Sequence, residues 1–571
     1  MKKGTYVLII FLIFFFIILA TIVSFIYFEF GRPPAIKARS YLEVKLSGEL
    51  QEKAAPDFLM SMFMGRKPLS MYDIWMNVQK AKVDRRIKGL ILRLGYIQCD
   101  WAKINELREI ILDFRKSGKK VYAVIDEAID FDKEYYLATA CDKIILHPQG
   151  LMVINGIGGY IPFIKKTLDK LGVEAEVEHV EEYKTASSMF TEEGFTPAHK
   201  EMMESIYENI FSQYIKVIAE ARGKSETEIK TLIDHGYFQA NKAKESGLVD
   251  ELLYEDEFES FLQEEGEKIH KITYEQYLKI KPSSLGLNKG KKIALIYGIG
   301  LIHTGEGLLG QTMGSSTVAR LIRRARKDKS IAAVVFRVDS PGGSSVASDI
   351  IGREVALTKK EKPVIVSMSD VAGSGGYWVS MAAHKIVAQP QTLTGSIGVV
   401  FTKFNLVKLY EKIGITGEKL TYGKRADIFS TFRRLTPEER DFIKQEILWT
   451  YEQFLIKVAD NRNMKKEEVD KIGKGRVWTG SQAKEQGLVD EIGGLSKAIE
   501  LAKELAGIPA DEEVKLVVWP KKVSFLNALI GKRLSYTNLG LNPRLEKMFS
   551  TFKVLERERI LVLMPFWIAP E

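Results

Sequence analysis

Short, wholly apolar runs alternate with amphipathic stretches along most of the chain. Each run has the length of a buried strand, and the stretches between runs have the period of helices packed on one face. Runs that are apolar on both faces are typical of parallel strands covered by helices. The pattern therefore predicts an α/β fold with parallel pairing. The expected strands are 41–46, 89–94, 121–125, 293–297, 332–338 and 364–368, and the expected helices are 104–115, 318–326 and 345–358.

The N-terminal stretch breaks this alternation. No charged residue occurs between Lys3 and Glu29, and Val7–Phe28 is almost wholly apolar. That is long enough to cross the hydrocarbon core of a bilayer as one helix. A cleaved signal peptide would have a shorter apolar core and an Ala-x-Ala site, so the stretch predicts an uncleaved anchor over 6–28. Lys2 beside Lys3 favours a cytoplasmic N-terminus, with the rest of the chain outside the cytoplasm.

The remainder of the chain is a tandem duplication. Ala243–Glu251 recurs almost unchanged as Ala483–Glu491, and three further matches follow in the same order along both halves. Four matches in one order indicate an internal repeat rather than chance. Polar, Pro- and Gly-containing residues separate the halves, and the repeat stops near Pro520. The predicted divisions are a first repeat over 36–280, a linker over 281–292, a second repeat over 293–518 and a tail over 519–571. The apolar end of the tail, 560–568, is too short to span a bilayer and is expected to pack on the body.

The two repeats differ after corresponding strands. In the second repeat, Asp339–Ser344 contains Gly342 and Gly343, whereas the aligned Gly95–Cys99 of the first repeat lacks the pair. Two adjacent glycines let the backbone turn sharply and point N–H groups at a ligand. The second repeat therefore carries a candidate anion-binding turn that the first has lost.

A second difference accompanies the first. Ser374 stands between Gly373 and Gly375 where strand 364–368 leads into a helix, and the aligned residues 132–134 of the first repeat are Asp, Lys and Glu. A serine at a helix N-terminus is exposed to the positive end of the helix dipole, which suits a nucleophile. Close packing of helix on strand would also explain the glycines. The joint loss of both glycine turns in one repeat favours catalysis.

A lysine is the better candidate base. Ala372 stands where a hydrolase nucleophile elbow needs glycine, and His384 is expected to be structural. Lys184 and Lys424 occupy corresponding positions in the two repeats. A basic lysine at neutral pH needs its pKa lowered by about 3 units, which costs about 4 kcal/mol and requires burial or a nearby cation. Apolar neighbours favour Lys184, while Arg425 adjoins Lys424, so both remain candidates.

Composition excludes several other kinds of site. The net charge is +9 over 571 residues, but no nucleic-acid-binding motif accompanies it, so nucleic acid is not an expected partner. Two cysteines exclude a disulfide scaffold and a thiolate zinc site. The seven histidines have no metal-ligand spacing. No metal or organic cofactor is expected.

Taken together, Asp339–Gly343, Ala372–Tyr377, Thr394–Val399 and Glu182–Lys184 resemble the signal peptide peptidase A (protease IV) family in its long, tandem-repeat form. The resemblance covers nearly the whole chain. It implies two repeats of the Clp protease/crotonase fold behind a transmembrane helix, and a Ser/Lys dyad divided between them. The implied roles are Ser374 as nucleophile, Lys184 as general base, Ser396 as the serine that orients the lysine, and Gly342, Gly343 and Gly375 as oxyanion donors. Lys424 remains the rival base.

The same resemblance implies a function and a location. Members of the family degrade cleaved signal peptides and other apolar peptides at the membrane, so the expected partners are such peptides, the lipid bilayer and three further copies of the chain in a homotetramer. The expected location is the bacterial inner membrane, single-pass, with the repeats on the extracytoplasmic side. A crotonase-like acyl-CoA enzyme and a catalytically silent membrane scaffold are the alternatives. Labelling of Ser374 by an acylating probe separates both from a peptidase.

Overall fold

The computed structural model describes residues 11–18, 20–21, 34–53, 69–263, 269–308, 310–520 and 560–565. Much of the predicted anchor over 6–28 lies outside these residues, and its described parts, 11–18 and 20–21, are helical. Within the described ranges, every helix is too short or too polar to cross a bilayer.

Each repeat is built on its own twisted sheet with parallel central strands, as the apolar pattern predicts. The first has the order β10-β1-β3-β4-β5-β9 and the second β20-β18-β16-β14-β11-β22. The strands of the first sheet are β1 (Ser40–Gln51), β2 (Leu69–Ser70), β3 (Ile87–Gln98), β4 (Lys120–Ile125), β5 (Lys143–Leu146), β9 (Glu251–Leu252) and β10 (His270–Thr273). Those of the second are β11 (Lys291–Ile299), β14 (Ile331–Ser340), β16 (Val364–Gly373), β17 (Lys385–Ala388), β18 (Leu393–Gly395), β20 (Val477–Thr479), β21 (Glu491–Ile492) and β22 (Val514–Trp519).

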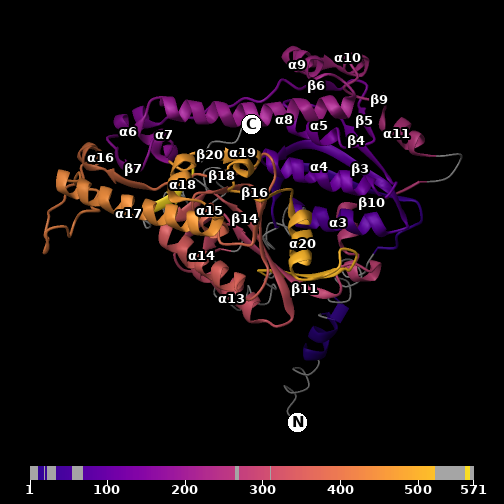
Figure 1. The fold of residues 1–571 in the computed structure, drawn as a ribbon. Coiled ribbons are helices and arrows are strands. Elements are labelled where there is room, and N and C mark those ends of the chain that lie inside the picture. The colour runs from indigo at the N-terminus through magenta and orange to yellow at the C-terminus, as the bar shows by residue number, and fades with distance from the viewer. Residues whose placement is uncertain are drawn as a thin grey trace, which may run out of the picture.

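Helices cover both sheets, and the predicted helices are confirmed (Figure 1). Those of the first repeat are α3 (Met71–Val83), α4 (Trp101–Arg115), α5 (Asp132–Ala138), α6 (Lys165–Leu171), η2 (Thr185–Ser187), α7 (Ser188–Thr191), α8 (Pro197–Arg222), α9 (Glu226–His235), α10 (Ala240–Glu245), α11 (Glu255–Leu262), α12 (Tyr274–Leu278) and η3 (Pro282–Leu285). Those of the second are α13 (Ser315–Lys327), α14 (Ser345–Lys359), α15 (Gly375–Ser380), α16 (Val407–Ile413), α17 (Pro437–Arg462), α18 (Lys466–Ile472), α19 (Gly480–Glu485) and α20 (Leu495–Leu505).

The duplication is visible in α8 and α17, which both have 26 residues. Each begins with proline after a threonine N-cap, Thr196 or Thr436, whose side chain accepts a backbone hydrogen bond. Proline suits the first helical turn because its missing N–H would have no partner there. The repeated Thr-Pro pair therefore starts the same long helix twice.

A third sheet joins the repeats, with the order β13-β12-β15-β23-β19-β7. Its β7 belongs to the first repeat, and β23 comes from the tail. A two-stranded sheet of β6 and β8 completes the topology. The remaining strands are β6 (Leu151–Val153), β7 (Glu174–His179), β8 (Tyr237–Gln239), β12 (Leu301–His303), β13 (Thr312–Gly314), β15 (Gly342–Ser344), β19 (Val400–Asn405) and β23 (Ile560–Leu563).

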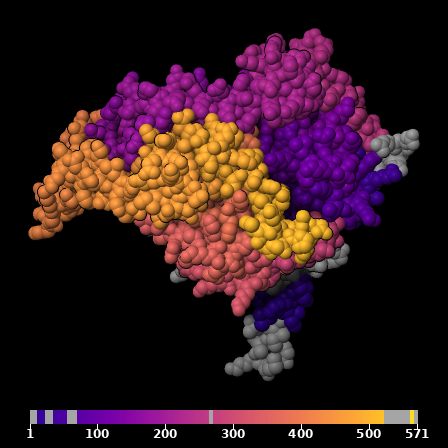
Figure 2. All heavy atoms as spheres, in the orientation of Figure 1, coloured from indigo at the N-terminus to yellow at the C-terminus, as the bar shows by residue number. Residues whose placement is uncertain are grey.

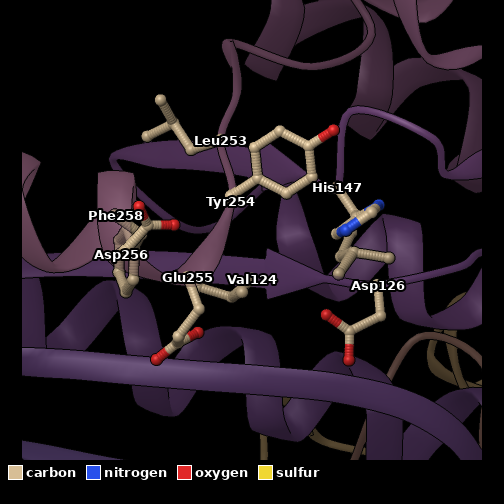
Figure 3. Close-up of a pocket in the computed structure, with 9 residues that line it drawn as sticks. Val124, Asp126, His147, Leu253, Tyr254, Glu255, Asp256 and Phe258 are labelled. Carbon is tan, nitrogen blue, oxygen red and sulfur yellow. The ribbon is translucent and has the colours of Figure 1, made fainter.

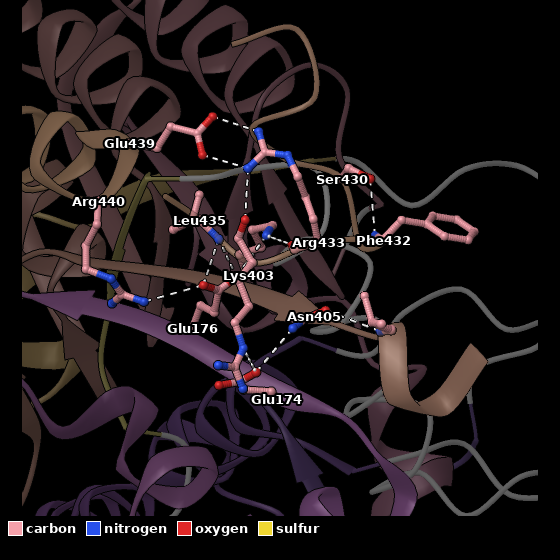
Figure 4. A network of polar contacts seen from close by, with 12 residues as sticks. Glu174, Glu176, Lys403, Asn405, Ser430, Phe432, Arg433, Leu435, Glu439 and Arg440 are labelled. Atoms are coloured by element: carbon pink, nitrogen blue, oxygen red, sulfur yellow. Dashed lines mark hydrogen bonds and ion pairs between the residues drawn. The ribbon is translucent and has the colours of Figure 1, made fainter. Parts of the chain in front are cut away.

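Charged side chains reinforce the join between β7 and β19 (Figure 4). Lys403 Nζ lies 2.8 Å from Glu176 Oε2, and both side chains are buried. Arg440 also approaches Glu176, and Arg434 Nε lies 2.6 Å from Glu174 Oε2. Removing one member of the buried pair would leave the other charge without a partner, so these residues require each other when the repeats are docked.

The two repeats form one continuous body, from which part of the second repeat projects at the left edge of Figure 2. The projection contains α16 and the segment before α17. Its surface is unusually apolar, since Leu420 and Tyr422 are 91% and 96% exposed. The other exposed apolar side chains there are Ile413, Ile415, Phe429 and Phe432.

Candidate active site

Ser374 lies at the end of β16, as the N-cap of α15. Its φ of 53° places a non-glycine residue in the left-handed region, which is a strained conformation. The N–H of Ser374 donates to the Gly395 carbonyl at 2.7 Å, and its own carbonyl accepts from Trp378. Ser374 is fully buried. The turn that the sequence indicates is therefore present, and it holds the hydroxyl in one place.

Lys184 reaches Ser374 from the other repeat. It lies between β7 and η2, 190 positions earlier in the chain. Its Nζ is 2.8 Å from Ser374 Oγ, 2.9 Å from the Ser396 carbonyl and 3.0 Å from Ser396 Oγ. The lysine is 1% exposed. Ser374 and Ser396, both named by the sequence, thus contact the amine of the third named residue, Lys184.

Burial lowers the pKa of Lys184 well below its ordinary value. Water cannot solvate the ammonium form at this depth, so the neutral amine is favoured. Within the described residues, no carboxylate forms an ion pair with Lys184 that would oppose this effect. A neutral amine has two N–H donors and one lone pair. The two Ser396 oxygens can take the donors, which leaves the lone pair for the Ser374 hydroxyl proton.

Two glycines of the second repeat make room for the lysine. A Cβ on Gly475 would lie 2.5 Å from Lys184 N, and a Cβ on Gly398 would lie 3.0 Å from Lys184 Cδ. Gly475 has a φ of +81°, and its N–H donates to the Ile397 carbonyl. Sequence reasoning missed both glycines. Gly398 belongs to the motif Thr394–Val399. For both glycines, however, the sequence does not indicate that they contact Lys184.

Lys424, the rival base, has a different environment. Its side chain is 76% exposed, and its Nζ lies 2.7 Å from Glu438 Oε1. Lys424 therefore lacks the burial that surrounds Lys184. The amine of Lys424 thus contacts Glu438 rather than Ser374.

The Gly342–Gly343 turn lies against the N-terminus of α15. The two glycines have φ values of +103° and +149°, and a Cβ on Gly342 would lie 2.7 Å from Gly375 N. Only glycine allows the two backbones to come this close. The N–H of Gly342 donates to Ser340 Oγ at 3.2 Å, so this donor already has a partner. The turn and Gly375 are brought together as the sequence suggests, with Gly342 serving the close approach.

The C-terminal segment Ile560–Pro565 lies between β15 and β19, beside these residues. Strand β23 pairs antiparallel with β15, where Val562 faces Gly343, and with β19, where Leu561 faces Val400. The N–H of Met564 donates to the Pro341 carbonyl at 2.8 Å. Residues 561–564 are all buried. The predicted packing of the tail on the body is confirmed for 560–565, and 566–568 lie outside the described residues.

The corresponding place in the first repeat has no equivalent chemistry. The N-cap of α5 is Phe131, and the next residue, Asp132, accepts hydrogen bonds from Tyr214 Oη and Gly156 N. A neighbouring carboxylate, Glu134, accepts from Ile97 N. These carboxylates bond to backbone N–H groups and to a tyrosine, and they stand where the second repeat has Ser374 and its glycines.

A cavity of 320 Å³ also lies in the first repeat (Figure 3). It is lined by Val124, Ile125, Asp126, His147, Leu253, Tyr254, Glu255, Asp256 and Phe258, and none of Ser374, Lys184 and Ser396 lines it. Across the described ranges, no group of three His, Cys, Asp or Glu side chains is arranged to hold a metal ion.

Similar sequences show the family to which the chain belongs. The chain is 37% identical to the chloroplastic serine protease SPPA of Arabidopsis thaliana, covering 84% of this chain and 71% of that one. It is 34% identical to protease 4 of Haemophilus influenzae, covering 84% and 80%. Among solved structures, ClpP1 from Listeria monocytogenes matches with 15% identity, 35% and 89% coverage and a TM-score of 0.23. The model of peptidase family S49 matches residues 113–268 and 356–509. The chain is therefore a member of peptidase family S49, a serine peptidase with two family repeats.

Proposed function

We propose that this serine peptidase cleaves peptide bonds with Ser374 as nucleophile and Lys184 as general base. Neutral Lys184 takes the proton from Ser374 Oγ as that oxygen attacks the peptide carbonyl carbon. The C–N bond then breaks, and Lys184 gives the proton to the leaving amine. Water, deprotonated by the same amine, attacks the acyl-enzyme and releases Ser374. Ser396 orients the amine throughout.

The backbone donors of the oxyanion site are proposed on the glycine turns. Charge develops on the carbonyl oxygen as the tetrahedral intermediate forms, and fixed N–H groups stabilise it. Gly343 and Gly375 supply N–H groups beside Ser374. Gly342 permits the approach of the two turns, since its own N–H already bonds to Ser340.

The single observation that supports the dyad is the 2.8 Å contact between a buried lysine of one repeat and a buried serine of the other. Ser374→Ala should abolish both peptide hydrolysis and labelling by a fluorophosphonate probe. Lys184→Ala should also abolish hydrolysis, while Lys424→Ala should leave it near the wild-type rate. Equal activity of Ser374→Ala and wild type would refute the assignment. A larger loss of hydrolysis in Lys424→Ala than in Lys184→Ala would show that Lys424 is the base.

Substrates are proposed to bind as extended apolar strands between β15 and β19. Two observations support this path: β23 already takes it, and its residues are Ile560, Leu561, Val562 and Leu563. An incoming peptide would displace β23 and pair with the same two strand edges. Cleaved signal peptides have long apolar cores, so they fit this requirement. Mass spectrometry of products from a signal-peptide library, with Ser374→Ala as control, tests it. Preferential cleavage of polar peptides would contradict the proposal.

Membrane attachment is proposed from the apolar stretch Val7–Phe28, with the repeats on the extracytoplasmic side of a bacterial inner membrane. Carbonate extraction of membranes and protease accessibility in spheroplasts test these points.

We further propose repeats of the Clp protease/crotonase fold and a homotetramer. The exposed apolar projection before α17 supports self-association, because such patches mark protein contacts. Light scattering of Leu420→Ser/Tyr422→Ser against wild type tests that surface.

A further inference from the structure

A buried charge cluster lies where the first repeat meets the strand ends that carry Gly342, Gly343 and Ser374. Carboxylates and cations in it come from both repeats, and water is largely excluded from it. Its cations are Lys103 on α4 and Arg337 on β14, and its carboxylates are Glu52, Glu106, Asp339 and Asp370. The peptidase chemistry described above uses none of these side chains.

Lys103 connects the two catalytic strands. Its Nζ lies 2.8 Å from Asp339 Oδ2, at the end of β14, and 2.9 Å from Asp370 Oδ2, near the end of β16. Only 9% of its side chain is exposed. Asp339 lies three residues before Gly342, and Asp370 lies four residues before Ser374. One cation from the first repeat thus holds together the two segments that lead into the oxyanion turn and the nucleophile.

The pairing of β14 with β16 is broken at this point. Val338 pairs with Met368 and Ser340 pairs with Ala372, so one residue of β14 faces three residues of β16. Such a bulge re-aims the strand that follows it. The Asp339 carboxylate accepts a hydrogen bond from Val371 N at 3.2 Å, which replaces a lost backbone partner. The bulge is therefore stabilised by side chains rather than by the strand ladder.

The first turn of α4 contributes more than the cation. Asp370 Oδ1 accepts from Lys103 N at 2.8 Å, and Asp370 Oδ2 accepts from Asp100 N at 3.3 Å. Free N–H groups and the helix dipole favour a carboxylate at this end of a helix. The same turn of the first repeat therefore binds Asp370 twice, through its backbone and through the lysine side chain.

Arg337 extends the contact to the other side of the bulge. Its guanidinium lies 2.8 Å and 3.0 Å from the two Glu52 oxygens and 2.5 Å from Glu106 Oε2. Glu106 is on α4, and its other oxygen accepts from Leu495 N at 2.7 Å. Arg337 thus links β14 to Glu52 and, through Glu106, to α4.

We propose that Lys103 is a positioning residue: by bridging Asp339 and Asp370 it keeps the β16 bulge closed and so aligns Ser374 with Gly342 and Gly343. Without the cation, two buried carboxylates would face each other across the bulge and repel, because like charges interact strongly where water is excluded. The strand ends would separate, and the hydroxyl would move relative to the oxyanion turn. This inference rests on the proposed roles of Ser374 and Lys184.

The test is a double-mutant cycle on the full chain, read by the rate at which a fluorophosphonate labels Ser374. Lys103→Met should slow labelling by about 100-fold, the effect of a misplacement of roughly 1 Å. Asp370→Asn, which keeps an oxygen for the α4 N–H groups, should slow it by about tenfold. The double variant should be no slower than Lys103→Met, because both changes remove the same bridge.

Lys80 gives the matched control. It is also buried in the first repeat, but within the described part of the chain its Nζ donates to two carbonyls, those of Tyr277 and Ile280, at 2.8 Å and 3.0 Å. Lys80→Met should lower thermal stability and leave the labelling rate near wild type. The pH at which the Lys103→Met rate is half its maximum should also stay unchanged, because burial rather than the charge of Lys103 lowers the pKa of Lys184. That readout separates positioning from an electrostatic effect on the base.

Each outcome has a defined meaning. Labelling of Lys103→Met at the wild-type rate overturns the inference while leaving the dyad intact, and failure of wild type itself to label Ser374 overturns the dyad. Additive losses in the double variant, about 1,000-fold together, also overturn the bridge. If Lys103→Met does not fold, Asp370→Asn alone decides: a folded variant with unchanged labelling refutes the bridge, and a slowed one supports it.

Discussion

Lys184 packs directly against Gly475, so the effect of Gly475→Ala on the rate of catalysis can be estimated. A Cβ at position 475 would lie 2.6 Å from both Cα and Cβ of Lys184. Nonbonded carbon atoms rest about 3.5–4.0 Å apart, so the overlap is about 1 Å. The clashing atoms are mainly backbone, and a change of rotamer cannot relieve them. The substitution must therefore displace the segment that carries Lys184.

We expect the rate of labelling to fall strongly while the protein stays folded. Moving a catalytic group by about 1 Å costs about 100-fold in rate. The strain of a left-handed alanine costs about 1 kcal/mol of stability, which leaves a domain of this size folded. The assay is the rate of fluorophosphonate labelling at Ser374 under pseudo-first-order conditions, with thermal unfolding measured on the same samples.

Gly118→Ala is the control, because Gly118 has nearly the same φ, +80°, but a Cβ there would meet nothing within 4 Å. Both variants should stay folded, with Gly475→Ala less stable than Gly118→Ala by about 1–3 kcal/mol because of the overlap, and only Gly475→Ala should lose its labelling rate. A folded Gly475→Ala protein that labels as fast as Gly118→Ala would refute the idea that this close contact positions the base.

Four further predictions concern Lys184 and the residues around it. Because burial lowers the pKa of Lys184, the labelling rate should rise with pH through that lowered pKa and level off above it. The free energy of unfolding should also rise with pH between the folded pKa and the unfolded value near 10.5, and Lys184→Met, assayed by urea unfolding, should lose that rise; an unchanged slope contradicts the burial argument. Ser396→Ala removes the oxygen at 3.0 Å but keeps the carbonyl at 2.9 Å, so labelling should fall only about five- to tenfold; a complete loss would mean that the hydroxyl does more than orient. A chain ending at Pro520 lacks β23 and should hydrolyse apolar peptides with a higher kcat/KM; an equal or lower value would show that β23 does not compete with substrate.

Much of the secondary structure follows from local patterns. The predicted strands and helices are all present, and their pairing is parallel as the apolar runs indicate. The prediction ended β16 at Met368, yet the strand continues to Gly373. The apolar run stops there because Ser369 and Asp370 are polar, although both are buried. Their partners, Glu52 and Lys103, come from the other repeat, so the local pattern contains no sign of this burial.

Some residues of the site are likewise identified by local sequence features, and others only by the structure. Comparing the two repeats singled out Ser374 and the Gly342–Gly343 turn, because glycine turns and a serine between them are local features. Local sequence features do not distinguish Lys184 from Lys424, since both are lysines at corresponding positions. The structure gives them opposite surroundings, one buried beside Ser374 and one exposed beside Glu438. A pKa depends on burial, and burial depends on which segments meet.

By itself, the sequence determined the repeats, the α/β elements, the glycine turns and the identity of the candidate nucleophile. These depend on periodicity and on backbone conformations that neighbouring residues set. Only the tertiary structure decided that Lys184 meets Ser374 across 190 positions, that Gly475 leaves room for it, that Lys103 bridges the strand ends and that β23 pairs with β15 and β19. The physical reason is that these contacts form when two repeats dock, and docking energies belong to surfaces assembled from distant segments.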